Sequence, residues 1–193
     1  TAGTHINVKI GVTNAGKITA AEARLVYEAG AFPGSPVPSG CRTMFAPYDI
    51  ENVYVDSYSV IDNKPSTGAY RAPGAPSGSF AAEAVVDEIC EQLSMDPLEF
   101  RLMNAAKEGT RRATGMVNPV IGCVETTEAT KDHEHWTTPK KDGPYVGRGV
   151  ATGFWMNGAG PACATANVNY DGTVNLTIGS MDIGGTRPAA AQQ

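Results

Sequence analysis

Arg71 lies in a segment that permits close approach of the backbone to another group. Gly68 and Gly74 flank it without side chains, and Pro73 restricts the backbone between them. A guanidinium is always charged and offers five N–H donors in a fixed fork, which suits recognition of a polar or anionic group. Two interpretations follow for Arg71: it binds a ligand, or it fastens the loop to backbone carbonyls. Tyr70 either shares that role or only packs.

A second candidate site is the glycine-bearing turn from Gly179 to Arg187. Gly184 and Gly185, followed by Thr186, would expose backbone N–H groups at the start of a helix. Unpaired amides and the helix dipole both favour anions, so such a turn suits a phosphate or a pterin. A plain strand-to-helix connection has the same pattern, and the turn alone leaves both interpretations open.

Potential metal ligands are sparse. The four cysteines stand apart, whereas zinc ribbons and iron–sulfur clusters need clustered thiolates. His133 and His135, with Asp132 and Glu134 beside them, have ligand chemistry, but nothing supplies a second group of ligands. We therefore expect no metal held by side chains of this chain, and reduced cysteines.

The elements that position Arg71 are expected to form an α+β fold. Alternating apolar residues predict a strand over 6–12, and a turn followed by a strand over 18–27 completes a hairpin. β-like residues recur at 53–55 and 58–61, while 30–40, rich in glycine, proline and serine, is expected to be loop.

A helix pair should follow the Arg71 segment and pack on this mixed sheet. The first helix is expected to be capped by Ser79 and to end near Ser94. The second has Asp96 as its N-cap, Pro97 at its first position and Glu99 in a capping-box arrangement.

The C-terminal half is expected to hold a second, partial α/β sheet domain. Residues 110–146 are polar and lack periodicity, which indicates an exposed connection between a first domain over 1–109 and a second over 147–193. Strands are expected over 149–155, 162–170 and 173–178, with Asp171-Gly172 turning the last two into a hairpin. A helix should begin at Pro188.

Three motifs together resemble the large subunit of molybdenum hydroxylases of the xanthine dehydrogenase/aldehyde oxidase family. Residues 68–76, GAYRAPGAP, are similar to the family's A-Y/F-R-G-x-G-x-P loop, and 96–104 matches D-P-x-E-x-R-x-x-N. Segments 147–151, 170–174 and 179–187 resemble the start of the family's second molybdopterin-binding domain. The chain thus resembles a central fragment: the C-terminal part of the first such domain, a connection, and the start of the second.

The resemblance implies a molybdenum–molybdopterin cofactor, either plain or as the cytosine dinucleotide. It also implies oxidation of an aldehyde or N-heterocycle carbon with oxygen from water. Arg71 would orient the substrate or the metal's ligands. Ala72 replaces the copper-binding cysteine of the family's carbon monoxide dehydrogenases, so the chain resembles the hydroxylases. The residues that the resemblance places at the cofactor are Ala69, Tyr70, Arg71, Ala72, Gly184, Gly185 and Thr186.

Other implied parts are missing or altered. The family's G-Q-G pattern is Gly184-Gly185-Thr186 here, which lacks the glutamine amide. The family's G-G-G-F-G-like loop and the G-E-x-P-like motif of its catalytic glutamate do not occur, so the catalytic glutamate is not in this chain. We expect the chain alone to bind molybdopterin poorly and to turn nothing over. Phe154, Trp155 and Asn157 lie where relatives have residues near the substrate pocket, with core packing as the alternative for both aromatics.

The implied partners are a 2Fe-2S iron–sulfur subunit and an FAD-containing flavin subunit, or equivalent domains, together with a small-molecule substrate. The alternative function is a non-catalytic scaffold or binding module that keeps the fold. A net charge of −5 with mixed signs argues against nucleic acid as a partner. No apolar run reaches a membrane span and no signal peptide is visible, so we expect a cytoplasmic location, with the periplasm left open.

Overall fold

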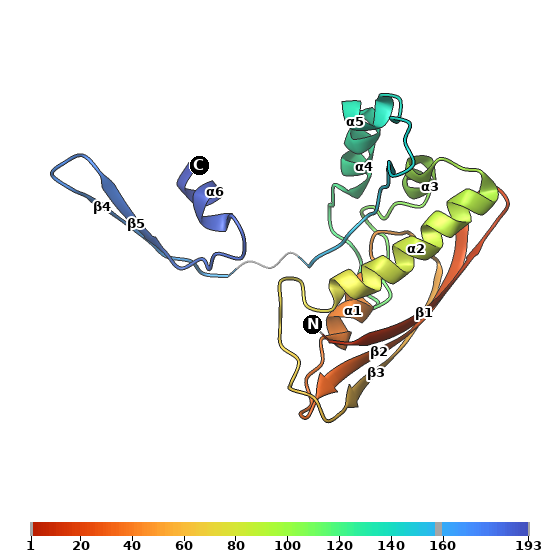
Figure 1. Ribbon diagram of the computed structural model, residues 1–193, viewed down its shortest axis with the longest axis horizontal. Coiled ribbons are helices and arrows are strands. Elements are labelled where there is room, and N and C mark those ends of the chain that lie inside the picture. The colour runs from red at the N-terminus through yellow and green to blue at the C-terminus, as the bar shows by residue number, and fades with distance from the viewer. Residues whose placement is uncertain (1, 157–159, 193) are drawn as a thin grey trace. The chain divides into compact units, whose positions relative to one another are not determined.

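The computed structural model describes residues 2–156 and 160–192, which belong to two compact units (Figure 1). The first unit comprises Thr1–Trp155 and the second Met156–Gln193. The first unit contains the loop with Arg71, and the second contains the glycine turn.

The first unit contains a three-stranded sheet. It comprises β1 (Thr4–Val12), β2 (Ile18–Gly30) and β3 (Asn52–Ile61), in the order β1-β2-β3. β1 pairs with β2 antiparallel and β2 pairs with β3 parallel, so the predicted hairpin and mixed sheet are confirmed. The two β-like segments expected near residues 53–61 are one continuous strand.

The core lies between the central strand β2 and the long helix α2 (Ala75–Leu93), which crosses one face of the sheet in Figure 1. Alternate residues of β2 point toward this helix, and Leu25 and Tyr27 are fully buried. Val86 of α2 and Phe100 are buried against the same cluster. Burial of an aliphatic or aromatic side chain contributes about 1.5–3 kcal/mol, so each of these side chains stabilises the unit.

The expectation that 30–40 is entirely loop is wrong, because helix α1 (Val37–Thr43) begins inside it. Pro38 is compatible with the first turn of a helix, where no backbone donor is required. Gly40 is required for packing, since a Cβ there would lie 2.7 Å from the Tyr27 hydroxyl. Pro38 and Gly40 indicated a loop in the sequence. In the structure, Pro38 lies in the first turn of a helix and Gly40 allows a close contact with Tyr27.

Helix α2 begins earlier than expected. Its N-cap is Gly74, in the left-handed conformation and without a side-chain hydrogen bond, so the prediction of Ser79 as the cap is wrong. Pro76 lies in the first turn, which again suits a helix start. The expected end at Ser94 is confirmed, since this residue is the left-handed C-cap.

Helix α3 (Pro97–Met103) has Asp96 as its N-cap and Pro97 at its first position, as predicted. The expected capping box is wrong, because in the described residues no bond joins the Glu99 side chain to the Asp96 amide. The Asp96 carboxylate accepts hydrogen bonds from the backbone of Leu98 at 2.8 Å and of Glu99 at 3.0 Å. The Glu99 carboxylate pairs with Lys131.

The expected exposed connection over 110–146 contains two helices, α4 (Cys123–Asp132) and α5 (Glu134–Thr137). Only Thr127 of these two helices is buried, so no apolar periodicity marks them in the sequence. Threonine hydroxyls donate to carbonyls one turn back, as Thr130 does to Thr126 at 2.9 Å. This bonding satisfies polar side chains on a helix that the sequence pattern does not reveal.

The strand expected over 149–155 is wrong, because these residues have no regular secondary structure. They belong to the first compact unit, which extends to Trp155. In the second unit, β4 (Ala164–Val168) and β5 (Val174–Ile178) form the predicted antiparallel hairpin. Helix α6 (Thr186–Gln192) starts at Thr186, slightly before the expected Pro188. Among the described residues, no helix is both long and apolar enough to cross a membrane.

Asn104 links helix α3 to the β1–β2 turn. Its side chain accepts from the Ile18 amide at 2.9 Å and donates to the carbonyls of Gly16 and Phe100, each at 2.9 Å. The side chain is fully buried. Without it, the Ile18 amide and the Gly16 carbonyl would lose this partner, whereas the Phe100 carbonyl still accepts from the Asn104 backbone amide at 3.3 Å.

We expect Asn104→Ala to lower the free energy of unfolding in urea by about 3 kcal/mol, because several buried polar groups lose their partners. The matched control is Asn52→Ala, whose exposed amide donates to the Thr19 carbonyl at 3.2 Å and whose loss should change stability by less than about 0.5 kcal/mol. Equal effects of the two substitutions would contradict the role assigned to Asn104.

Candidate functional site

The loop that carries Arg71 is anchored on both sides to the end of strand β2. On one side, the Thr67 amide donates to the Ala29 carbonyl at 3.0 Å. On the other, the buried Tyr27 hydroxyl donates to the Gly74 carbonyl at 2.9 Å. Burial is the main cause that raises the pKa of Tyr27, so this phenol stays a neutral donor. The two anchors fix the ends of the loop and leave its tip to the solvent.

Gly74 allows this loop to pass close to helix α1. Its φ is +80°, and a Cβ at this position would lie 2.3 Å from the Pro36 carbonyl oxygen. Any other residue would meet both a strained backbone and a direct clash. The glycine that the sequence singled out is therefore needed to seat the loop on α1.

The predicted site residues Ala69, Tyr70 and Arg71 form the exposed tip of the loop. Tyr70 is 81% exposed, so it does not pack in the first unit. Within the part of the chain that the structure describes, the Arg71 side chain has no hydrogen bond or ion pair to protein groups. Its donors are thus available to an external group.

Ala72 adopts the left-handed conformation, with φ of 59°. The resembling family motif has glycine at this position, and this chain has alanine. Its carbonyl accepts from the Ala75 amide at 3.1 Å, which turns the chain into helix α2. The residue after Arg71 therefore sets the direction in which the loop enters the helix.

The other predicted loop, in the second unit, is organised by Asp182. Its carboxylate accepts from the Gly184 amide at 3.0 Å and from the Thr186 amide at 3.3 Å. These backbone bonds, Gly184 first, lower the pKa of Asp182. Gly184 and Gly185 both have positive φ, as expected of a tight turn. An external anion would therefore have to replace the Asp182 carboxylate at these amides.

The predicted residues thus lie in two separate units. Ala69, Tyr70, Arg71 and Ala72 share one loop of the first unit, while Gly184, Gly185 and Thr186 share one turn of the second.

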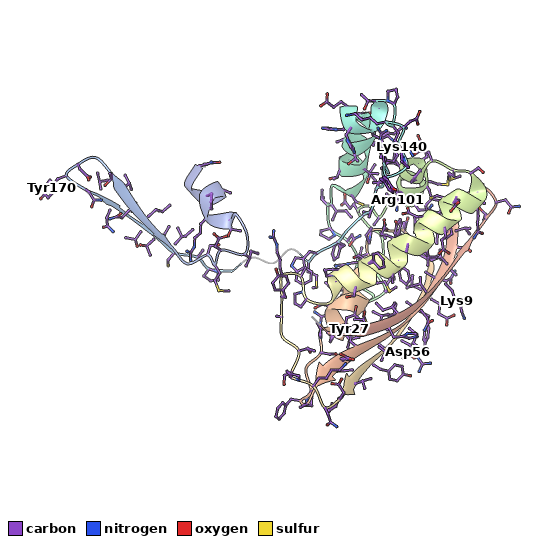
Figure 2. The ribbon with its side chains drawn as sticks, viewed as in Figure 1. Lys9, Tyr27, Asp56, Arg101, Lys140 and Tyr170 are labelled. Atoms are coloured by element: carbon purple, nitrogen blue, oxygen red, sulfur yellow. The ribbon has the colours of Figure 1, made fainter. Side chains whose placement is uncertain are left out.

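Sequence reasoning missed a buried ionic network between α2 and α3. Arg101, labelled in Figure 2, belongs to helix α3. It donates to the Glu83 carboxylate through Nε at 3.0 Å and Nη2 at 2.8 Å, and its side chain is only 1% exposed. Nη2 also reaches Asp87 at 2.9 Å, and the Tyr48 hydroxyl donates to Glu83. The signal was present, since Arg101 is the arginine of the D-P-x-E-x-R-x-x-N pattern.

The surroundings of this network shift the pKa values of both Arg101 and Tyr48. Burial would lower the pKa of Arg101, but the negative surroundings, with Glu83 and Asp87 bonded to it, raise it. Burial and the nearby Glu83 charge raise the pKa of Tyr48, so the phenol remains a hydrogen-bond donor. The Arg101 and Asn104 side chains of the motif are thus both buried and bonded within the first unit.

The remaining candidates are the two histidines, His133 and His135, and the residues Phe154, Trp155 and Asn157. The His133 Nδ1 accepts from the His135 amide at 3.1 Å and caps α5. Among the described residues, no group of three or more His, Cys, Asp or Glu is placed to hold a metal ion. The Arg112 guanidinium lies 5.6 Å from the Phe154 ring centroid, and Trp155 is half-exposed. Asn157 lies outside the described residues.

Comparison with known proteins agrees with the motifs. Residues 1–105 match the model of the molybdopterin cofactor-binding domain. The chain is 30% identical over 131 residues to the large molybdopterin subunit of nicotinate dehydrogenase from Eubacterium barkeri, covering 66% of this chain and 31% of that protein. It is also 30% identical over 189 residues to PaoC, the molybdenum-binding subunit of an Escherichia coli aldehyde oxidoreductase, covering 92% and 25%.

The fold is shared as well. The structure of the aldehyde oxidoreductase from Desulfovibrio desulfuricans superposes with a TM-score of 0.68 at 28% identity, over 91% of this chain and 20% of that one. The chain spans less than a third of the length of each of these relatives.

These matches define a molybdopterin cofactor-binding domain. The chain belongs to the family of molybdopterin-binding subunits of xanthine dehydrogenases and aldehyde oxidoreductases, which confirms the resemblance of its motifs. Members of this family are oxidoreductases.

We expect Ala72→Gly to raise the free energy of unfolding by about 0.5–1 kcal/mol. Glycine removes the left-handed strain, and part of that gain is offset by the greater freedom of the unfolded chain. The control is Ala69→Gly in the same loop, where no positive φ is relieved and stability should stay equal or fall. Urea unfolding of both variants measures the difference, and a loss of stability in Ala72→Gly would contradict the strain at this position.

Proposed function

We propose that this chain is the part of a molybdenum hydroxylase large subunit that presents Arg71 to the molybdenum–molybdopterin cofactor. The observation that carries the proposal is the loop over residues 68–74. Its ends are anchored by the Ala29 and Gly74 carbonyls, while the Arg71 guanidinium at its tip is free of protein partners among the described residues. A fixed loop with an unpaired fork of donors is what recognition of an oxygen-rich or anionic group requires.

The residues of this loop fit the cofactor. Adding a Cβ at Gly68 would meet no atom within 4 Å, so open space lies beside the backbone there. The tip residues Ala69, Tyr70 and Arg71 are all exposed, and the cation complements an anionic pterin phosphate or a polar ligand of the metal. When bound, the molybdenum centre supplies the oxidation chemistry, and the protein supplies orientation and hydrogen bonds.

The turn of the second unit is proposed to add backbone contacts. The amides of Gly184, Gly185 and Thr186 would face the pterin side of the cofactor once Asp182 has released them. No side-chain amide is present at Gly185, in contrast with the family's G-Q-G pattern, so this contribution rests on the main chain. The cofactor is proposed to be molybdopterin, either plain or as its cytosine dinucleotide.

The proposed reaction is oxidation of an aldehyde or an N-heterocycle carbon with oxygen from water. The relatives named above act on aldehydes and on nicotinate, which represent both substrate classes. Arg71 would orient the substrate or the metal's ligands, and the base that accepts a proton would be a glutamate outside this sequence. Electrons would leave through 2Fe-2S and FAD groups of an iron–sulfur subunit and a flavin subunit.

The 193-residue chain alone should contain far less than one molybdenum per chain, even when it is produced in a host that makes the cofactor. The reason is that it carries only part of the contacts that the relatives' longer chains would provide. Elemental analysis of the purified chain measures this, and stoichiometric molybdenum would contradict the prediction.

In the complete large subunit, assembled with its partners, Arg71→Ala should lower kcat/KM by about a hundredfold, the loss typical for one well-placed charged donor. Arg71→Lys should recover part of the activity, because it keeps the charge and loses the fork. Arg42→Ala, at another exposed arginine, is the control. Unchanged kcat/KM in Arg71→Ala, with normal molybdenum content, would refute the role of Arg71.

A further inference from the structure

A strap of extended chain, residues 149–153, lies against helix α2 in the first unit. Together with Ser79, Phe80, Glu83, Ala84 and Asp87, it lines a cavity of about 510 Å³. The strap has no regular secondary structure, so no ladder or helix fixes it. Its position must therefore depend on a few specific contacts.

One hydrogen bond joins the strap to the core. The Thr152 amide donates to Glu83 Oε2 at 2.7 Å. Within the described residues, no other hydrogen bond is made by residues 149–153. The conformation of the strap thus rests on this one polar contact and on packing.

The acceptor is unusually well fixed. The Glu83 side chain is only 7% exposed, Arg101 binds Oε2, and the Tyr48 hydroxyl donates to Oε1. Because the acceptor is a carboxylate paired with the buried Arg101 guanidinium, the bond from Thr152 is charge-assisted and stronger than one between neutral groups. Asp87, also bonded to Arg101, has a 58% exposed side chain and receives no donor from the strap.

Both flanks of the strap are held as well. On the N-terminal side, Arg148 donates to the carbonyls of Trp136 and Thr138, each at 2.9 Å. On the C-terminal side, the Phe154 ring faces Arg112 at 5.6 Å. Both ends of the strap are held, and only one hydrogen bond lies between them. Breaking that bond would therefore release the middle of the strap without opening the core.

We propose that Glu83 is a positioning residue: its buried carboxylate fixes the strap on α2 and thereby sets the position of Phe154 and the point where the chain leaves the first unit. The same carboxylate neutralises Arg101, so the packing of α2 on α3 and the placement of the strap are coupled. Any bearing of Phe154 on catalysis rests on the proposed function, whereas the positioning rests on contacts within the first unit.

Thr152→Pro tests the proposal, since it removes the amide donor and leaves the buried network intact. Thr152→Ala is the matched control, because it keeps that amide. Limited trypsin digestion cleaves after Arg148, at the start of the strap, and mass spectrometry identifies the fragments. Cleavage there should be roughly tenfold faster in Thr152→Pro, as expected from the loss of a bond to a charged acceptor. Thr152→Ala should match the unaltered chain in cleavage and melting temperature, and Thr152→Pro should melt only a few degrees lower, because the helices and the sheet keep their contacts.

Two further measurements separate the lost bond from an effect of proline itself. Ala151→Pro removes a neighbouring amide that donates to no group in the described residues, and it should leave cleavage unchanged. In the unaltered chain, the Thr152 amide should exchange with deuterium at least about tenfold more slowly than the Ala151 amide. Equal cleavage of Thr152→Pro and Thr152→Ala, equal effects of the two prolines, or equal exchange rates would each overturn the proposal.

Discussion

The first unit depends on a charge that has been removed from water. Arg101 is fully buried, and an isolated cation in that position would cost several kcal/mol. Glu83 neutralises it from helix α2, and the Pro97 carbonyl accepts from Nη1 at 3.0 Å. The pairing fixes α3 relative to α2, because a shift of either helix would leave a buried charge without its partner. Apolar contacts would tolerate such a shift more easily, since they are not directional.

The loop with Arg71 is positioned through the same helix. Helix α2 starts at the loop and is seated on α1 by the glycines Gly40, Gly74 and Gly78, where added side chains would meet backbone or the Tyr27 ring. Tyr27 of the central strand β2 donates a hydrogen bond to the Gly74 carbonyl, which holds the start of α2 on the sheet. The exposed tip therefore sits on a base held by these contacts, which gives Arg71 a defined place.

Several parts of the fold could be predicted from the sequence. The alternating residues of β1 and the Asp96-Pro97 start of α3 are patterns within single elements. The structure contains both the strand and the helix start that they predict. Helix α1 could not be predicted, because Pro38 and Gly40 indicate a loop unless the tertiary contact with Tyr27 is known. Helix α4 could not be predicted either, because its threonines and charged residues show no apolar face.

In the candidate sites too, some features could be predicted from the sequence and others could not. The loop around Arg71 follows from its glycines and from the family resemblance, while the exposure of its tip and the left-handed conformation of Ala72 are given only by the structure. A charged residue such as Arg101 in a short helix is expected at the surface, and its burial follows only from the partners that α2 and the Tyr48 segment bring to it. The capping of the second loop by Asp182 likewise requires the turn geometry.

The most direct measurement is a double-mutant cycle on Glu83 and Arg101, followed by urea unfolding. Arg101→Met and Glu83→Leu should each lower the free energy of unfolding by about 3–5 kcal/mol. The first leaves the buried Glu83 without Arg101, and the second leaves the buried Arg101 with only the more exposed Asp87 as its ionic partner. The double variant should be more stable than either single one, since neither charge then remains in the core. Additive losses, with a coupling energy near zero, would contradict the dependence of this unit on the buried pair.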